Sequence, residues 1–224
     1  MQRIITTASN TDQKPLLQHR FICLLFAIFF TYWMYGWLTC LNVEDWIIEN
    51  LLVVICISLV IASHKWHRLS EFSYLCLFVF VMLHLYGAFY AYTRNNLGEW
   101  LRDTYHLARN PYDRIVHFSF GLLLAYPIRE ILVNKYKLTG NASWWMPIQF
   151  VFSLGTIFEL IEWGVATFTD TETGETYVAT QGDVWDAHKD IILALIGTTI
   201  SMTILYGIKR GYFTHRSKNL VLTK

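Results

Sequence analysis

Four long stretches of the sequence contain no Asp, Glu, Lys or Arg: residues 21–43, 72–93, 138–158 and 191–208. An α-helix needs about 20 mainly apolar residues to cross the hydrocarbon core of a bilayer. A soluble domain usually carries about a quarter charged residues, whereas this chain of 224 residues carries 16%. The spacing of the charges therefore predicts a polytopic, all-α membrane protein. It excludes a disordered chain, a nucleic-acid-binding protein with a basic face and a disulfide-rich secreted scaffold.

Hydropathy and charge together predict six transmembrane helices, over residues 20–41, 46–63, 70–92, 113–134, 144–168 and 186–208. The fourth is the most polar, because Arg129 and Glu130 fall near its end, where long side chains can reach the headgroups. The spans are expected to form one membrane domain over residues 20–208, a six-helix transmembrane bundle. A tail over 1–19 precedes it and a basic tail over 209–224 follows it, and both are expected in the cytoplasm.

Lysine and arginine residues in the loops predict the orientation of the bundle, because these residues are enriched on the cytoplasmic side. With the N-terminus in the cytoplasm, the inner segments hold twelve Lys and Arg residues. The outer segments then hold three, namely Arg94, Arg102 and Arg109. Both termini are therefore predicted to lie inside.

The outer segment 93–112 carries apolar residues at helical spacing, namely Leu97, Trp100, Leu101, Tyr105 and Ala108. Charged and polar side chains occupy the other positions of the same stretch. This pattern predicts a short amphipathic helix that lies on the outer membrane surface, and an ordinary loop is the alternative.

Ionisable side chains inside membrane spans are costly and usually functional. Three of the predicted spans carry such side chains in pairs one helical turn apart: Asp113 with His117, Glu159 with Glu162, and Asp186 with Asp190. Residues at this spacing share one face of a helix. In the predicted orientation all three pairs lie in the outer leaflet, so we expect them to converge at one depth.

Four carboxylates at one depth repel one another unless they are protonated, paired with basic side chains or neutralised by a bound cation. The basic side chains available are Arg102, Arg114 and Lys189. Carboxylate oxygens together with one imidazole suit a divalent ion such as Zn, Mn, Fe or Mg. We therefore predict a metal site whose ligands are His117, Glu159, Asp186 and Asp190.

Each of these residues also has a structural interpretation. A carboxylate at a helix start is commonly a cap or a partner of the helix dipole, which fits Asp113 and Asp186. Asp190 could pair with Lys189 or Arg114, and His117 could be a hydrogen-bonded core residue. Under that interpretation the polar groups form a structural network of ion pairs.

The chain resembles the YjdF-type bacterial inner-membrane proteins, a family without an established function. The matching stretches are residues 108–118, 129–132, 158–163 and 180–186, the last of which reads Thr-Gln-Gly-Asp-Val-Trp-Asp. The chain departs from the family pattern at Val116 and Phe120, which affects packing and leaves the polar set unchanged. The resemblance implies a multi-pass protein of the bacterial inner membrane, and it assigns no catalytic residue.

Three functions are open at this point. In the first, the protein is a metal-dependent hydrolase or transferase that acts on a lipid or lipid-linked substrate. Glu162, Asp113 and Arg114 then serve catalysis, Glu162 as general base or as a partner of the ligands, and Arg114 as a contact for an anionic headgroup. The alternatives are a proton-coupled transporter and a non-catalytic membrane assembly factor. The bilayer is the expected partner in all three, and no nucleic-acid partner is expected.

Overall fold

The computed structural model describes residues 20–90, 92–168 and 179–221, and this part of the chain is helical with no strand. Its seven helices are α1 (Arg20–Thr39), α2 (Val43–Trp66), α3 (Glu71–Phe89), α4 (Asn96–Tyr105), α5 (Tyr112–Asn134), α6 (Ala142–Phe168) and α8 (Asp186–Val221). The predicted N-terminal tail 1–19 lies outside the described residues. Six of the helices are long and apolar enough to cross a membrane, as the sequence predicts.

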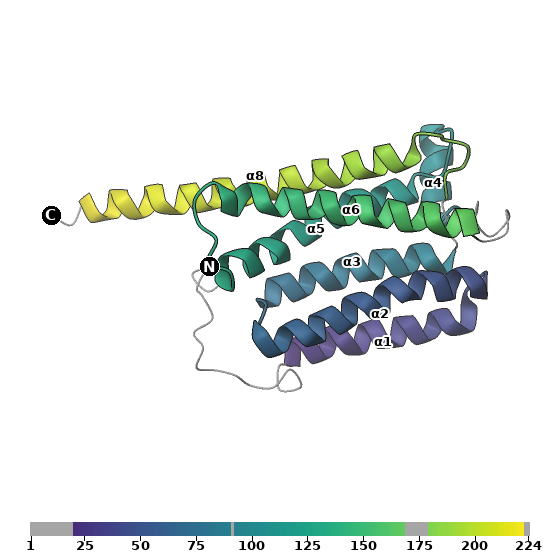
Figure 1. The fold of residues 1–224 in the computed structure, drawn as a ribbon, viewed down its shortest axis with the longest axis horizontal. Coiled ribbons are helices and arrows are strands. Elements are labelled where there is room, and N and C mark those ends of the chain that lie inside the picture. Colours follow the sequence, from purple (N-terminus) through teal and green to yellow (C-terminus); the bar gives the residue numbers. More distant parts are fainter. Residues whose placement is uncertain (1–19, 91, 169–178, 222–224) are drawn as a thin grey trace.

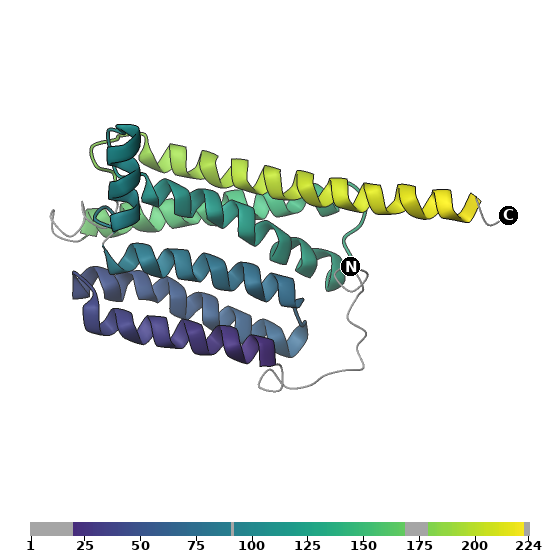
Figure 2. The ribbon, with the colours of Figure 1, turned by 180° about the vertical axis from the view of Figure 1, so that it is seen from behind.

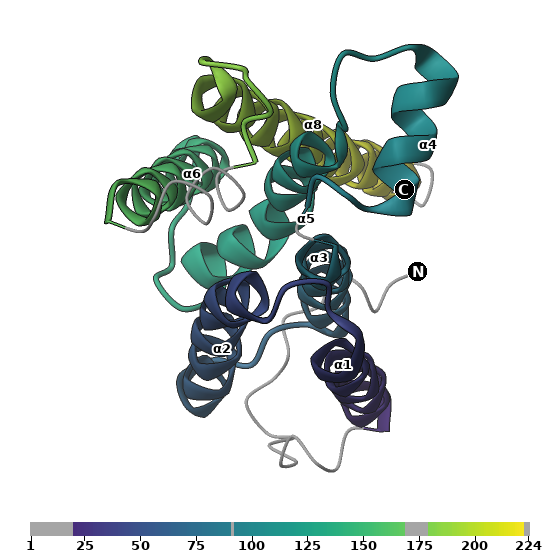
Figure 3. The same ribbon diagram turned by 90° about the vertical axis from the view of Figure 1, so that its right-hand side faces the viewer.

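The long helices form two groups that run side by side (Figure 1). Helices α1, α2 and α3 make one group, and α5, α6 and α8 make the other (Figure 3). Helix α5 joins them, because it packs against α3 on one side and against α6 and α8 on the other. Residues on α5 can therefore reach side chains from both groups.

The outward faces of these helices are apolar. Large hydrophobic side chains lie exposed along α1, α2, α3, α6 and α8, among them Leu24, Leu51, Phe72, Leu160 and Ile204. A soluble monomer rarely leaves so much contiguous apolar surface open to water. These faces are suited to contact with lipid acyl chains, which agrees with a multi-pass membrane protein.

Two glycines bring α5 and α8 into close contact. A Cβ atom added at Gly121 would lie 1.8 Å from the carbonyl oxygen of Ala194, and one at Gly197 would lie 2.2 Å from the carbonyl oxygen of Phe118. Small residues at helix crossings allow such backbone approach in membrane proteins. Gly121 follows His117 by one turn and Ala194 follows Asp190 by one turn, so this crossing places His117 and Asp190 side by side.

At the end of the bundle where α5 and α8 begin, α4 lies across the direction of the long helices, beside the group of α5, α6 and α8 (Figure 2). Its start is capped by the Asn95 side chain, which accepts a hydrogen bond of 2.6 Å from the Gly98 N–H. It ends at His106, which adopts a left-handed conformation with φ 53°. A helix is thus present in the segment 93–112, and its location on the membrane surface stays a prediction. We refer to this end as the α4 end.

Helix ends differ from the predicted ones by a few residues, with one larger difference. Helix α2 begins at Val43, which places Glu44 and Asp45 in its first turn, where the helix dipole favours acidic groups. Helix α8 continues to Val221, so the predicted end of the last span at residue 208 falls within it. The predicted basic tail is therefore largely a continuation of α8.

Candidate functional site

Six of the predicted polar residues lie at the α4 end. Asp113 and His117 occupy the first turns of α5, Asp186 and Asp190 those of α8, and Glu159 and Glu162 the last third of α6. All except Glu162 are buried. The convergence that was expected from the helix spacing is therefore present in the structure.

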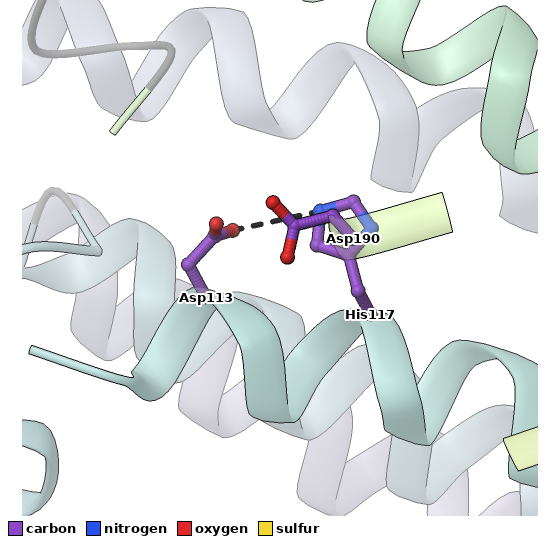
Figure 4. Close-up of side chains that lie close together, drawn as sticks. All are labelled: Asp113, His117 and Asp190. Carbon is purple, nitrogen blue, oxygen red and sulfur yellow. Dashed lines mark ion pairs between the residues drawn. The ribbon is translucent and has the colours of Figure 1, made fainter. Parts of the chain in front are cut away.

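Asp113, His117 and Asp190 form the tightest group. Each of them offers one ligand atom, and the three atoms lie within 4.8 Å of one another. Figure 4 shows the three side chains pointing toward a common point, with an ion pair of 3.5 Å between Asp113 Oδ1 and His117 Nε2. Two carboxylate oxygens and one imidazole nitrogen are ligand atoms of the kind that divalent metals bind.

Glu159 completes the surroundings of the imidazole from α6. Its Oε1 atom lies 3.6 Å from His117 Nδ1, so both ring nitrogens of His117 face a carboxylate. Both distances are longer than an ordinary N–H···O hydrogen bond. Within the part of the chain that the structure describes, Glu159 Oε1 and Asp190 Oδ1 have no hydrogen-bond partner, and their residues are only 8% and 2% exposed.

Asp186 is surrounded differently, by arginines. Its Oδ1 atom accepts hydrogen bonds from Arg109 and, at 3.2 Å, from Arg114. Arg109 also lies 3.6 Å from Asp113 Oδ2. The sequence predicted Asp186 as a metal ligand and Asp113 as a catalytic residue. In the structure Asp113 lies in the compact group with His117, and Asp186 lies outside it, bound to the two arginines.

The loop before α8 is held in place by the same arginines. Arg109 donates hydrogen bonds to the carbonyl oxygens of Ala179, at 3.1 Å, and Thr180, at 3.0 Å. The Gln181 side chain accepts from the Asn110 N–H at 2.9 Å and donates to the Asn110 carbonyl at 3.0 Å. The two stretches around Asn110 and Gln181, which carry much of the family resemblance, are thus in direct contact.

Asp183 anchors this loop to α5 and α8. It accepts hydrogen bonds from Lys189 Nζ and Arg114 Nη2, both at 2.5 Å. The hydrogen bonds from Lys189, the Trp185 N–H and Arg114 lower the pKa of the Asp183 carboxyl to about 2. Lys189 and Arg114 are therefore engaged by acids other than Asp190. Among the described residues, Asp190 makes no ion pair within 4.0 Å.

Glu162 lies one turn beyond Glu159 on the same face of α6. Its carboxylate interacts electrostatically with Asp113, Glu159 and Asp190, which places it beside the three-residue group and not in it. The side chains next to it on α6 face outward, since Ile161 is 52% and Trp163 is 65% exposed. Glu162 thus lies between the buried acids and the lipid-facing surface of α6.

A second polar group, contributed by α2 and α3, was missed from the sequence. The Glu49 carboxylate lies 3.6 Å from His84 Nε2, and the Tyr92 hydroxyl lies 2.6 Å from His84 Nδ1. Burial, followed by the negative charges of Glu49 and Asp113, raises the pKa of Tyr92 well above its ordinary value. The Tyr92 hydroxyl and His84 Nδ1 share this hydrogen bond. Glu49 lies inside a predicted span, so the principle that ionisable side chains within spans are usually functional, which singled out Glu159, applies to it as well.

Comparisons with known proteins show what this chain is similar to. The model of a family described as a predicted membrane protein (DUF2238) matches residues 21–211. The inner membrane protein YjdF of Escherichia coli (strain K12) is 30% identical over 161 residues, which cover 71% of this chain and 77% of that protein. These matches confirm the family resemblance seen in the sequence. No solved structure matches the chain.

Proposed function

This chain belongs to the DUF2238 family of predicted membrane proteins, and we propose that it binds a divalent metal ion at the α4 end and uses it in hydrolysis or group transfer on a lipid or lipid-linked substrate. By similarity to the E. coli inner membrane protein, we place it in a bacterial inner membrane. By its distribution of Lys and Arg, we place both termini in the cytoplasm, so the α4 end faces outward.

The observation that carries the proposal is the geometry of Asp113, His117 and Asp190. Their ligand atoms lie within 4.8 Å of one another, so small rotations of the side chains bring all three onto one ion. Among the described residues, Asp190 Oδ1 and Glu159 Oε1 are buried without a hydrogen-bond partner. A buried carboxylate without a partner is strongly unfavourable, and a divalent cation supplies the missing positive charge.

The remaining residues then take defined roles. Glu159 is a fourth ligand or orients His117, and Glu162 accepts a proton beside the centre. Asp186 holds Arg109 and Arg114 in position. Arg114, whose side chain is 27% exposed, is suited to an anionic headgroup. A divalent ion at such a centre acts as a Lewis acid and activates water as a nucleophile.

A substrate from the bilayer agrees with the surroundings of the centre. Leu160, Ile161 and Trp163 are all more than half exposed on α6, and they flank the acids Glu159 and Glu162. A lipid can therefore approach the centre laterally along α6. In the predicted orientation the polar groups lie in the outer leaflet, and Arg114, near the start of α5, lies closest to the headgroups.

Metal analysis of the full chain, purified in detergent without chelator, tests the proposal. We expect one equivalent of a divalent metal in the wild type and a loss of at least tenfold in occupancy in Asp190→Asn and His117→Ala. Asp183→Asn is the matched control, because it makes the same carboxylate-to-amide change outside the three-residue group. A wild type without stoichiometric metal, even after supplementation with Zn, Mn, Fe and Mg, contradicts the proposal.

The same variants distinguish a metal centre from a structural network of ion pairs. If no metal binds, Asp190→Asn removes a buried acid that lacks a cation, and the melting temperature should rise. If a metal binds, the same substitution removes a ligand, and the metal-dependent part of the melting temperature is lost.

One observation favours a second candidate function, proton-coupled transport. Glu49 interacts electrostatically with Asp113 and His117, so the ionisable groups extend from the α4 end of α5 into the group of α2 and α3. Buried acids and histidines are typical of proton relays in transporters. Proton flux into proteoliposomes that is abolished by Glu49→Gln, with no bound metal, favours this function over the first.

A further inference from the structure

At the end of the bundle opposite α4, two basic side chains approach one tryptophan ring. The guanidinium carbon of Arg129, on α5, lies 3.9 Å from the centre of the Trp144 ring, on α6. Lys209 Nζ, on α8, lies 5.6 Å from the same ring. The ring of Tyr206 packs edge-on against Trp144 with the centroids 5.1 Å apart. Three helices thus place two positive charges around one indole.

These charges have no acidic partner in the part of the chain that the structure describes. Arg129 and Lys209 form no ion pair there, and Nε and Nη2 of Arg129 are buried without a hydrogen-bond acceptor. The adjacent acid, Glu130, is already used, since its carboxylate accepts hydrogen bonds from the side chains of Ser70 and Ser73.

The segments that lead from α5 into α6 and that end α8 offer no other acid. The segments 135–143 and 209–224 contain seven Lys and Arg residues between them and no Asp or Glu. A cation beside an aromatic face is stabilised by the ring, but the ring does not neutralise the charge. The described part of the chain therefore supplies no counter-charge for Arg129.

The depth of the two cations indicates where that counter-charge is. Arg129 lies five residues before the end of α5 at Asn134, which is roughly 7.5 Å at 1.5 Å per residue. From this depth its long side chain reaches the headgroup region, and tryptophan is enriched at the same level. Beyond Trp144 on α6, the apolar side chains of Trp145 and Phe150 are 66% and 42% exposed, which suits contact with acyl chains.

We infer that Arg129, Trp144 and Lys209 bind the phosphodiester headgroup of an anionic phospholipid at this end of the bundle. The planar guanidinium suits a phosphate oxygen pair, and Lys209 adds a second charge from α8. Basic pockets between transmembrane helices bind anionic headgroups in this way. The lipid's acyl chains lie along the exposed apolar face of α6. The site is independent of the metal centre and stands whatever the outcome there.

Lipid titration of the purified full chain in detergent tests the inference, with native mass spectrometry to count bound lipids. We expect phosphatidylglycerol to bind at least tenfold more tightly than phosphatidylcholine, and Arg129→Gln and Lys209→Gln each to reduce that preference at least threefold. Arg129→Lys should have an intermediate effect, because it keeps the charge and loses the planar fork. Arg20→Gln is the matched control, since it removes one exposed positive charge from α1, in the other helix group.

Three results overturn the inference. The first is an equal affinity for phosphatidylglycerol in the wild type and in Arg129→Gln. The second is an equal affinity of the wild type for the two lipids. The third is a rise in melting temperature with inorganic phosphate as large as that with phosphatidylglycerol, which indicates a general anion site. If Arg129→Gln does not fold, the lipid affinity of Lys209→Gln alone tests the inference. The Lys209 side chain is exposed, so this substitution should leave the fold intact.

Discussion

Gly121→Ala should separate α5 from α8 and disrupt the metal centre without touching a proposed ligand. The added Cβ would lie 1.8 Å from the Ala194 carbonyl oxygen and 2.8 Å from Thr198 Oγ1, whereas contacts below 3.0 Å are essentially never observed. The closest contact is with a backbone oxygen of Ala194, which cannot rotate away as a side chain can. The two helices must therefore move apart by about 1 Å at this crossing, at a cost of about 1–3 kcal/mol.

Gly155→Ala provides the matched control. Gly155 lies inside α6, and a Cβ there meets no atom within 4 Å. Alanine is favoured over glycine in a helix by about 1 kcal/mol, and this gain is common to both variants. The difference in free energy of unfolding between them thus isolates the clash, and we expect Gly121→Ala to be less stable by about 1–3 kcal/mol.

The effect on metal binding follows from the same displacement. Ala194 lies one turn beyond Asp190, so a shift of α8 at Ala194 carries Asp190 away from His117. Metal–ligand distances tolerate only about ±0.2 Å, and disturbing the support of a ligand typically costs about 10–100-fold in affinity. Denaturant unfolding in detergent and a metal titration measure the two effects separately. If Gly121→Ala lost stability but bound metal as tightly as Gly155→Ala, the argument that this crossing positions the ligands would be refuted.

Three further predictions concern other parts of the chain. The folded-state pKa of Asp183 is about 2 and its ordinary value is 3.8, so its contribution to stability is complete above about pH 4 and is lost as the pH falls through 2. The difference in free energy of unfolding between wild type and Asp183→Asn should therefore be full above about pH 4 and shrink as the pH falls to about 2. Glu130→Gln weakens the acceptor of the hydrogen bonds from Ser70 and Ser73 and should lower stability by about 1–2 kcal/mol, with Glu71→Gln, exposed on α3, as the control. A reporter fused after Lys224 should be cytoplasmic and one inserted at residue 173 external; an external C-terminus contradicts the predicted orientation.

The positions of the membrane helices could be predicted because they depend on composition alone. Charge-free stretches of about 20 residues have few alternatives to a transmembrane helix. The ends were harder, since Glu44 and Asp45 are tolerated in the first turn of α2 and the basic residues after 208 continue α8. Charged residues end an apolar span, but they do not end a helix.

The composition of the polar site could also be predicted, but the contacts within it could not. Spacing of three or four residues shows that two side chains share a helix face, and it does not show which face of the neighbouring helix they meet. That depends on the close crossing at Gly121 and Gly197, which sequence periodicity does not reveal. For the same reason the contact between Glu49 and His84, which joins α2 to α3, could not be read from spacing.

The acids at the α4 end fall into two classes, and this division favours a metal centre over a structural network of ion pairs. Asp186 and Asp183 accept from arginine or lysine, so their charges are balanced within the protein. Asp190 Oδ1 and Glu159 Oε1 are buried without a hydrogen-bond partner among the described residues, and the imidazole of His117 lies next to both carboxylates. A network of ion pairs would distribute Arg109, Arg114 and Lys189 over all the acids, because each unpaired buried charge is costly. Arg114 and Lys189 instead pair with Asp183 and Asp186, and Arg109 is shared between Asp186 and Asp113. Asp190 and Glu159 are left beside His117 without an Arg or Lys partner among the described residues, a set of ligand atoms that suits a divalent ion.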